Sequence, residues 1–182
     1  MLAARIVNAT HAIQSAPLSR EGSHRVAVMC PKGGVGKTVT AAALAHNLSQ
    51  LRGEVVAAVD GNVHSGTLRR RLVPADRPLP APMIELAKLA MSGQSAPEWP
   101  WLARWHDLVG RMRVFSNQGA DPALVEAMPG AAYSALIALL SRASQLVVQD
   151  MGTSVTGGTA RAALDSADTL VIATDLTQDT LE

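Results

Sequence analysis

The chain has 182 residues and a formal net charge of +1, with 48% hydrophobic, 17% charged and 3% aromatic residues. This composition suffices for one domain with a sizeable core, and it excludes overall disorder. The scarcity of aromatic side chains argues against a stacking platform for single-stranded nucleic acid, and the small net charge gives no global attraction to nucleic acids or membranes.

The first segment, residues 1–24, is expected to lead into a single domain over residues 25–182. Ala3–Ile13 has the pattern of a short helix, and Ser15–Ser23 that of a linker. The segment lacks the apolar region of a secretory signal, and no apolar run in the chain is long enough to span a bilayer. Cys30 is the only cysteine, so no disulfide can form within the chain. These features predict a cytoplasmic protein without a transmembrane segment.

Strands and helices are predicted to alternate along the domain. In chain order, the predicted elements are the strand Arg25–Cys30, the helix Thr38–Leu51, the strand Glu54–Val59, the short helix Gly66–Leu72, the loop Val73–Pro82, the helices Met83–Met91 and Trp99–Val109, the strand Arg111–Ser116, the helix Ala131–Arg142, the strand Gln145–Gln149, the helix Gly158–Leu164 and the strand Thr169–Thr174. Trp101 and Trp105, one helical turn apart, are expected to form a packing stripe. The alternation indicates an α/β fold with a doubly wound, mainly parallel sheet and helices on both faces.

A glycine-rich segment, Lys32-Gly33-Gly34-Val35-Gly36-Lys37-Thr38, lies between the first strand and the first long helix. Its glycines let the backbone wrap closely around an anion, because no Cβ blocks the approach. Backbone N–H groups at a helix N-terminus bind phosphate, Lys37 can reach the β- and γ-phosphates, and the Thr38 hydroxyl can bind Mg²⁺. Pro31 stands where the strict pattern has its first glycine, so the loop entry is expected to differ. The alternative is a turn that binds nothing, and the strand-to-helix context favours phosphate.

Polar residues follow two further predicted strands, at the end where doubly wound sheets bind ligands. Asp60 and Asn62 follow the second strand, and Asp150 and Gly152 follow Gln145–Gln149. Carboxylates suit a hard cation such as Mg²⁺. Each aspartate also has a simpler interpretation, since Asp60 could cap the next turn and Asp150 could be an ordinary turn residue.

The segment from Lys32 to Thr38 resembles the deviant Walker A motif of the ParA/MinD group of ATPases, within the SIMIBI class of P-loop nucleoside triphosphatases. The resemblance covers about residues 25–174 and implies bound ATP and Mg²⁺. It also implies that Lys32 reaches across a nucleotide-sandwich homodimer to the partner's phosphates. The implied residues are Lys32, Lys37, Asp60 and Asn62 for catalysis, Gly33, Gly34, Val35, Gly36, Lys37, Thr38, Val39 and Gly152 for nucleotide binding, and Thr38, Asp60 and Asp150 for Mg²⁺.

The sequence departs from the family pattern at three points. Asn62 stands where the family has a second acidic residue that positions the attacking water, and an asparagine cannot become a carboxylate. Many members have Asp-x-Pro-x-Gly where this chain has Asp150-Met151-Gly152, whose Gly152 N–H is the expected γ-phosphate contact. The family also has later elements that supply much of the base pocket, so the domain is expected to be incomplete at its C-terminus. These departures predict slow hydrolysis and leave adenine and guanine both open.

Two further stretches bear on the partners. The segment from Val59 to Leu68 resembles actinobacterial MinD-like proteins, some of which accompany type VII secretion systems. In ParA-like proteins, basic surface residues bind the DNA backbone without reading its sequence. Arg69-Arg70-Arg71 is a candidate for such binding, although a solvated helix end is the favoured interpretation.

The leading hypothesis is an ATPase that dimerises with ATP and positions or partitions a cargo, such as a chromosome, a plasmid, or division or secretion machinery. It would act with a cargo or activator protein. One alternative, which Asn62 motivates, is a nucleotide-bound scaffold with little or no hydrolysis. Another is a small-molecule kinase or ligase of the same fold, which the lysine and glycines at Lys32-Gly33-Gly34 argue against.

Overall fold

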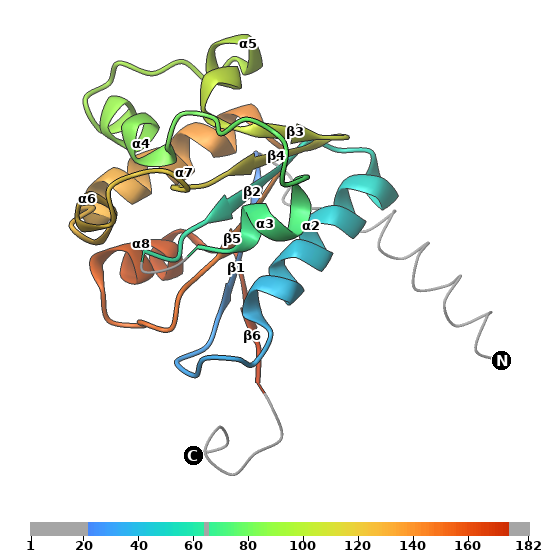
Figure 1. The fold of residues 1–182 in the computed structure, drawn as a ribbon, viewed down its shortest axis with the longest axis vertical. Helices are drawn as coiled ribbons and strands as arrows, with labels where there is room; N and C mark the ends of the chain where they lie inside the picture. The colour runs from blue at the N-terminus through green and yellow to red at the C-terminus, as the bar shows by residue number, and fades with distance from the viewer. Residues whose placement is uncertain (1–21, 64–65, 175–182) are drawn as a thin grey trace, which may run out of the picture.

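The apolar runs of the sequence form a six-stranded sheet at the centre of the fold (Figure 1). The computed structural model describes residues 22–63 and 66–174, so the predicted helix Ala3–Ile13 and most of the predicted linker Ser15–Ser23 lie outside the described residues. The strands are β1 (His24–Met29), β2 (Val56–Asp60), β3 (Asp107–Val109), β4 (Met112–Phe115), β5 (Leu146–Asp150) and β6 (Thr169–Ile172). The helices are α2 (Lys37–Arg52), α3 (Leu68–Leu72), α4 (Met83–Met91), α5 (Trp99–Leu102), the 3-10 turn η1 (Ala103–Trp105), α6 (Pro122–Glu126), α7 (Gly130–Ala143) and α8 (Gly158–Ser166).

The strand order is β3-β4-β2-β5-β1-β6, and every neighbouring pair is parallel except β3 and β4. Parallel strands end at the same edge of a sheet, so the loops after β1, β2 and β5 meet there. The doubly wound, mainly parallel sheet predicted from the sequence is thereby confirmed.

Helices cover both faces of the sheet because neighbouring strand residues point in opposite directions. On β5, Val147 packs into the apolar cluster that contains α4, α7 and α8, whereas Val148 packs into the cluster that contains α2 and α3. Figure 1 shows α2 and α3 on one side of the sheet and α4, α7 and α8 on the other. The helix α2 contacts the sheet through small residues, of which Ala41 and Ala45 are fully buried. This packing fixes the start of α2 at the edge where the strands end.

The predicted helix over Trp99–Val109 is wrong in its second half. The first half forms α5 and η1, in which the rings of Trp101 and Trp105 pack with their centroids 4.7 Å apart, as predicted. The strand β3 follows, because Gly110 adopts a φ of 59° and reverses the chain so that β3 pairs antiparallel with β4. In the sequence, Gly110 was the only signal of this turn. The helical spacing of Trp101 and Trp105 favoured a longer helix instead.

The short helix α6 was not predicted. The Asp121 carboxylate accepts a hydrogen bond from the Ala123 N–H at 2.9 Å and caps the helix, and Pro122 occupies its first position. An aspartate followed by proline is a known helix-start signal, so this element could have been found. Among the helices that the structure describes, none has both the length and the apolar character needed to cross a bilayer.

The helices α7 and α8 approach most closely where Gly130 meets Gly158. A Cβ at Gly130 would lie 2.7 Å from the Gly158 carbonyl oxygen, which is backbone and cannot rotate away. We therefore expect Gly130→Ala to lower the free energy of unfolding by about 1–3 kcal/mol, as overpacking does, when measured by urea denaturation. Ser134→Ala, at an exposed position on α7, is the control and should change it by less than about 0.5 kcal/mol. Equal stabilities of the two variants would contradict this close approach.

Candidate functional site

The glycine-rich loop joins β1 to α2 and places the first turn of α2 at the strand-end edge of the sheet. Gly34 and Gly36 have φ angles of 78° and 90°, in the left-handed region that favours glycine. The helix begins at Lys37, whose side chain is only 8% exposed. Its Nζ donates a hydrogen bond to the Lys32 carbonyl oxygen at 2.6 Å. The lysine is therefore folded back over the loop that it is expected to serve.

Two carboxylates end the neighbouring strands β2 and β5. Asp60 and Asp150 are register partners, with exposed fractions of 2% and 1%. The Gly61 N–H donates to the Asp150 carbonyl oxygen at 2.9 Å, which extends the pairing past the strand ends. The sheet thus holds two acidic side chains side by side, away from water.

Asp60 performs the turn-capping role that was the simpler of its two interpretations. Its Oδ2 accepts a hydrogen bond from the Leu68 N–H at 3.0 Å, and its Oδ1 one from the Asn62 N–H at 3.4 Å. Burial, and after it the charge of Asp150, raise the pKa of Asp60 to about 7, against the lowering effect of the two N–H donors. Gly66 is required beside it, because a Cβ there would lie 2.6 Å from the Asp60 Cγ. Asp60 therefore ties the start of α3 to the end of β2.

Asp150 has the character of a site for a cation. Among the described residues, neither of its carboxylate oxygens makes a hydrogen bond within normal distance and angle limits. Burial raises its pKa to about 6, against the lowering effects of the approaching Thr38 hydroxyl and of the charges of Lys37 and Arg71. A buried, unsatisfied carboxylate beside a hydroxyl fits Mg²⁺, which takes oxygen ligands. Within the described residues no three His, Cys, Asp or Glu side chains gather as a metal site.

A pocket of about 400 Å³ opens in front of the loop. Its walls are formed by Gly33, Gly34, Gly36, Lys37, Thr38, Val39, Asn62, Thr67, Arg71, Met151 and Thr153. Of the residues expected to bind nucleotide or metal or to act in catalysis, Lys32, Val35 and Gly152 do not line it, and neither do the buried Asp60 and Asp150. We call it the phosphate pocket, because loop, lysine and hydroxyl converge there.

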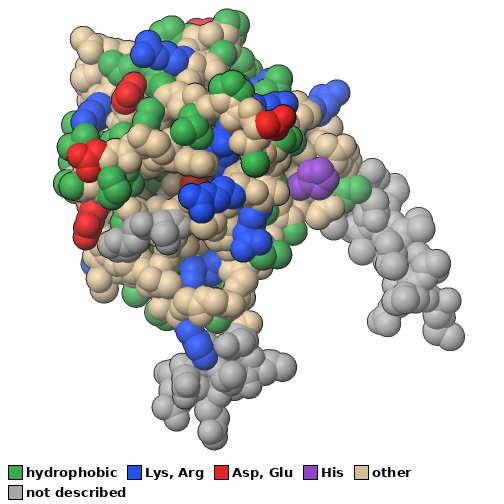
Figure 2. Space-filling view, in the orientation of Figure 1, with side chains coloured by type: hydrophobic (Ala, Val, Ile, Leu, Met, Phe, Trp, Pro, Cys, Tyr) green, Lys and Arg blue, Asp and Glu red, His purple; other side chains and the backbone are tan. Residues whose placement is uncertain are grey.

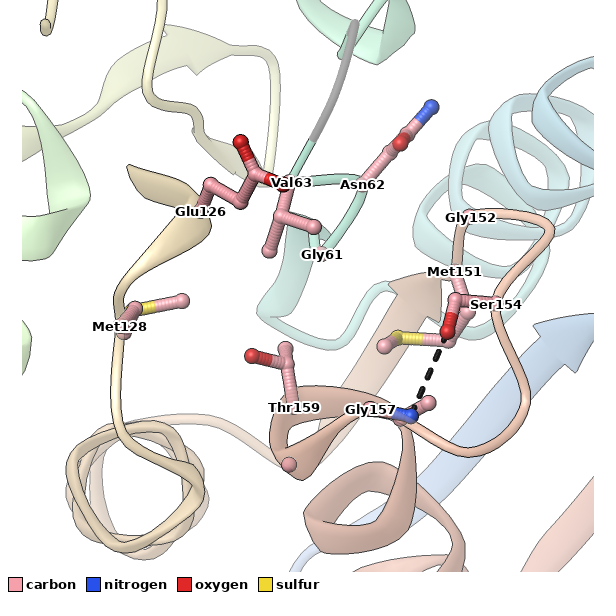
Figure 3. A pocket seen from close by; sticks show the side chains of 12 residues that line it. Gly61, Asn62, Val63, Glu126, Met128, Met151, Gly152, Ser154, Gly157 and Thr159 are labelled. Carbon is pink, nitrogen blue, oxygen red and sulfur yellow. Dashed lines mark hydrogen bonds between the residues drawn. The ribbon is translucent and has the colours of Figure 1, made fainter. Parts of the chain in front are cut away.

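Asn62 and Gly152 bring the loops after β2 and β5 into contact. A Cβ on Gly152 would lie 2.9 Å from the Asn62 Oδ1, so a larger residue there would require the Asn62 side chain to move. Gly152 does not line the phosphate pocket but a neighbouring one of about 220 Å³ (Figure 3), around which Val63, Met128 and Thr159 also lie. Asn62 borders both pockets and a third of about 230 Å³. Asn62 therefore lies at the border of all three pockets.

The prediction of a solvated helix end at Arg69-Arg70-Arg71 is wrong for Arg69. Its side chain is buried and donates to Asp107 at 2.7 and 3.1 Å, and to the carbonyl oxygens of Arg77 and Pro78 at 3.1 Å each. Sequence reasoning could not see this pair, because its members are separated by 38 positions. Because Arg69 is paired in this way, it is not available to bind nucleic acid, for which Arg69-Arg70-Arg71 was a candidate.

Four lining residues of the phosphate pocket were not predicted: Thr67, Arg71, Met151 and Thr153. Thr67 and Arg71 come from the start and the body of α3, and the other two from the loop after β5. Figure 2 shows Lys and Arg side chains gathered across the middle of the face that carries α2 and α3. The position of Arg71 in a helix directly after the Asp60 loop was a signal that could have found it.

The sequence model of the "CobQ/CobB/MinD/ParA nucleotide binding domain" matches residues 26–176. Comparison with curated protein sequences finds no match. Among solved structures, a ParA family ATPase from Chlorobium tepidum TLS superposes with a TM-score of 0.76 and 19% identity, over 88% of this chain and 63% of that one. The cell division ATPase MinD of Pyrococcus furiosus gives 0.67 and 19%, over 87% and 62%.

A third solved structure belongs to an enzyme of metabolism. Cobyrinic acid a,c-diamide synthase from Mycobacterium smegmatis, with a bound ATP analogue and magnesium, gives a TM-score of 0.63 and 23% identity over 84% of this chain and 58% of that one. At such identities the likeness establishes the fold. The chain spans 58% to 63% of the length of these three proteins.

The pKa of Asp150 makes the stability of the metal-free protein depend on pH. Because the pKa of about 6 in the folded protein exceeds the ordinary aspartate value of 3.8, ionisation in the folded state costs free energy as the pH rises through this window. Asp150→Asn removes that ionisation. We expect the variant to be more stable than the unmodified protein by about 1–3 kcal/mol at pH 8, at about 1.4 kcal/mol per pKa unit, with the advantage lost at pH 4.

Urea denaturation with EDTA at both pH values measures this difference. Asp165→Asn, at an exposed position on α8, is the matched control and should alter stability little at either pH. An Asp150→Asn variant that is less stable at pH 8 than the unmodified protein would contradict the assigned burial of an unpaired carboxylate.

Proposed function

Because the chain belongs to the CobQ/CobB/MinD/ParA nucleotide-binding domain family, we propose that it is a cytoplasmic ATPase whose two copies dimerise around ATP and Mg²⁺. Hydrolysis then separates the copies. The cycle positions or partitions a cargo through a cargo or activator protein. The observation that carries this proposal is the phosphate pocket, where the glycine loop, Lys37 and Thr38 face Asn62 with two carboxylates behind them.

Different residues around the phosphate pocket have different roles in the proposed phosphoryl transfer. The loop N–H groups and Lys37 bind the phosphates and neutralise their charge. Thr38, Asp150 and Asp60 would hold Mg²⁺, which when bound draws electron density from the phosphate oxygens. Asn62, whose amide oxygen lies close to Gly152, would orient a water through that oxygen. Positioning and charge neutralisation dominate this chemistry, so it proceeds without a strong base.

Lys32 supports a role between two chains. It is half-buried on the loop and does not line the phosphate pocket of its own chain. Its carbonyl oxygen accepts the bond from Lys37, so its backbone is tied to the site. A cation in this position would act on the phosphates of a second copy, as the resemblance implies.

The two loop lysines should therefore separate binding from dimerisation. We expect Lys37→Ala to weaken ATP binding about 100-fold or more, because the phosphates lose their buried cation, as measured by calorimetry with Mg²⁺. Lys32→Ala should bind ATP within a few-fold of the unmodified protein, yet remain monomeric in light scattering and lose turnover. Lys88→Ala, at an exposed position on α4, is the control. Normal dimerisation and turnover by Lys32→Ala would refute the role across the interface.

A second candidate is a nucleotide-bound scaffold, which the amide at position 62 favours. Asn62 lies where a water would be oriented but cannot accept a proton as a carboxylate does. We expect Asn62→Asp to raise the rate of phosphate release about tenfold or more, within the range of general-base effects. Absence of turnover in both proteins, with ATP bound to each, would favour the scaffold over the ATPase.

A further inference from the structure

We propose that Arg71 binds the terminal phosphate of the nucleotide from within the same chain, as a second cation besides Lys37. This inference rests on the proposed function, because it needs a nucleoside triphosphate in the phosphate pocket. It concerns a residue of α3, outside the glycine loop and outside the residues that the resemblance assigns.

The first step is the anchoring of α3. The Leu68 N–H at its start donates to Asp60, and the next side chain, Arg69, makes two hydrogen bonds to Asp107. The side chains of Arg69 and Asp107 are 5% and 3% exposed. A bidentate pair with such burial fixes both the position of the helix and its rotation about its own axis.

The second step is helical geometry. Successive residues of a helix are rotated by about 100°, so residues two apart point to nearly opposite sides. With Arg69 fixed toward Asp107, Arg71 must point away from it, and it lines the phosphate pocket. Arg70 points to neither side and lines the separate pocket of about 230 Å³ with Asn117 and Gln118. Three consecutive arginines therefore have three different surroundings.

The third step is the chemistry at Arg71. Its side chain is exposed and makes no hydrogen bond or ion pair with another described residue. Its charge nevertheless acts on Asp150, the carboxylate at the cation site. Arg71 borders the same pocket as Asn62, Thr67, the loop glycines and Lys37. A guanidinium presents paired N–H donors that match two phosphate oxygens.

The choice of the terminal phosphate follows from the two groups of lining residues. The glycines and Lys37 line the pocket at the start of α2, whose N–H groups bind the inner phosphates. Arg71 and Asn62 line the pocket from the chain segment that follows β2, whose last residue, Asp60, lies beside Asp150. In the proposed function the reacting phosphate and Mg²⁺ lie next to these carboxylates. Arg71 should therefore discriminate between nucleotides that have this phosphate and nucleotides that lack it.

The test compares the affinities of ATP and ADP, with Mg²⁺, by calorimetry on the full chain. Arg71→Ala should weaken ATP binding about tenfold or more and ADP binding less than about threefold, as expected for one charged hydrogen-bond pair. Arg71→Lys should restore part of the ATP affinity, because it keeps the charge and loses the fork. Arg70→Ala is the matched control and should bind both nucleotides within about twofold of the unmodified protein.

Each other outcome contradicts the inference in a recognisable way. Equal losses of ATP and ADP affinity in Arg71→Ala would overturn the assignment to the terminal phosphate. Unchanged affinities in Arg71→Ala, with normal binding by the unmodified chain, would overturn the contact and leave the proposed function intact. An unmodified chain that binds neither nucleotide would overturn the proposed function itself, and the contact with it.

Discussion

The burial of two like charges side by side is the constraint on which the rest of the site depends. Asp60 and Asp150 end adjacent strands in register, and both are almost inaccessible to water. Buried carboxylates that face one another are costly unless cations or N–H donors compensate them. The surrounding elements supply that compensation: the first N–H of α3 binds Asp60, and the ammonium of Lys37 and the guanidinium of Arg71 act on Asp150. The site thus consists of two buried carboxylates with basic side chains around them.

Much of the fold could be predicted because its elements are local. The strands β2 and β5 are short apolar runs that end in aspartate, and they begin and end within two residues of the predicted ranges. The helix α4 has the predicted bounds, Met83–Met91. The strand β3 could not be found in this way, because it exists through its pairing with β4 and the buried contact between Asp107 and Arg69. Neither contact leaves a periodic trace in the sequence.

The same division applies to the site. The glycine loop, Lys37 and Thr38 could be placed from the sequence, since strand, loop and helix follow one another directly. Thr153, in contrast, reaches the phosphate pocket from a strand that is distant in the chain, and only the parallel sheet brings it there. Lys32 and Val35 belong to the motif but lie outside the pocket walls.

Lys37 already donates a hydrogen bond within its own loop, so nucleotide binding must replace that hydrogen bond with one to a phosphate. With the Lys37 ammonium donating to the Lys32 carbonyl oxygen at 2.6 Å, the loop already holds a partner for its cation. An arriving phosphate must take that ammonium from the carbonyl, so the net gain is the difference between two hydrogen bonds. The displaced carbonyl then needs a new donor. Occupation of the pocket therefore changes the hydrogen bonding of the peptide that follows Lys32.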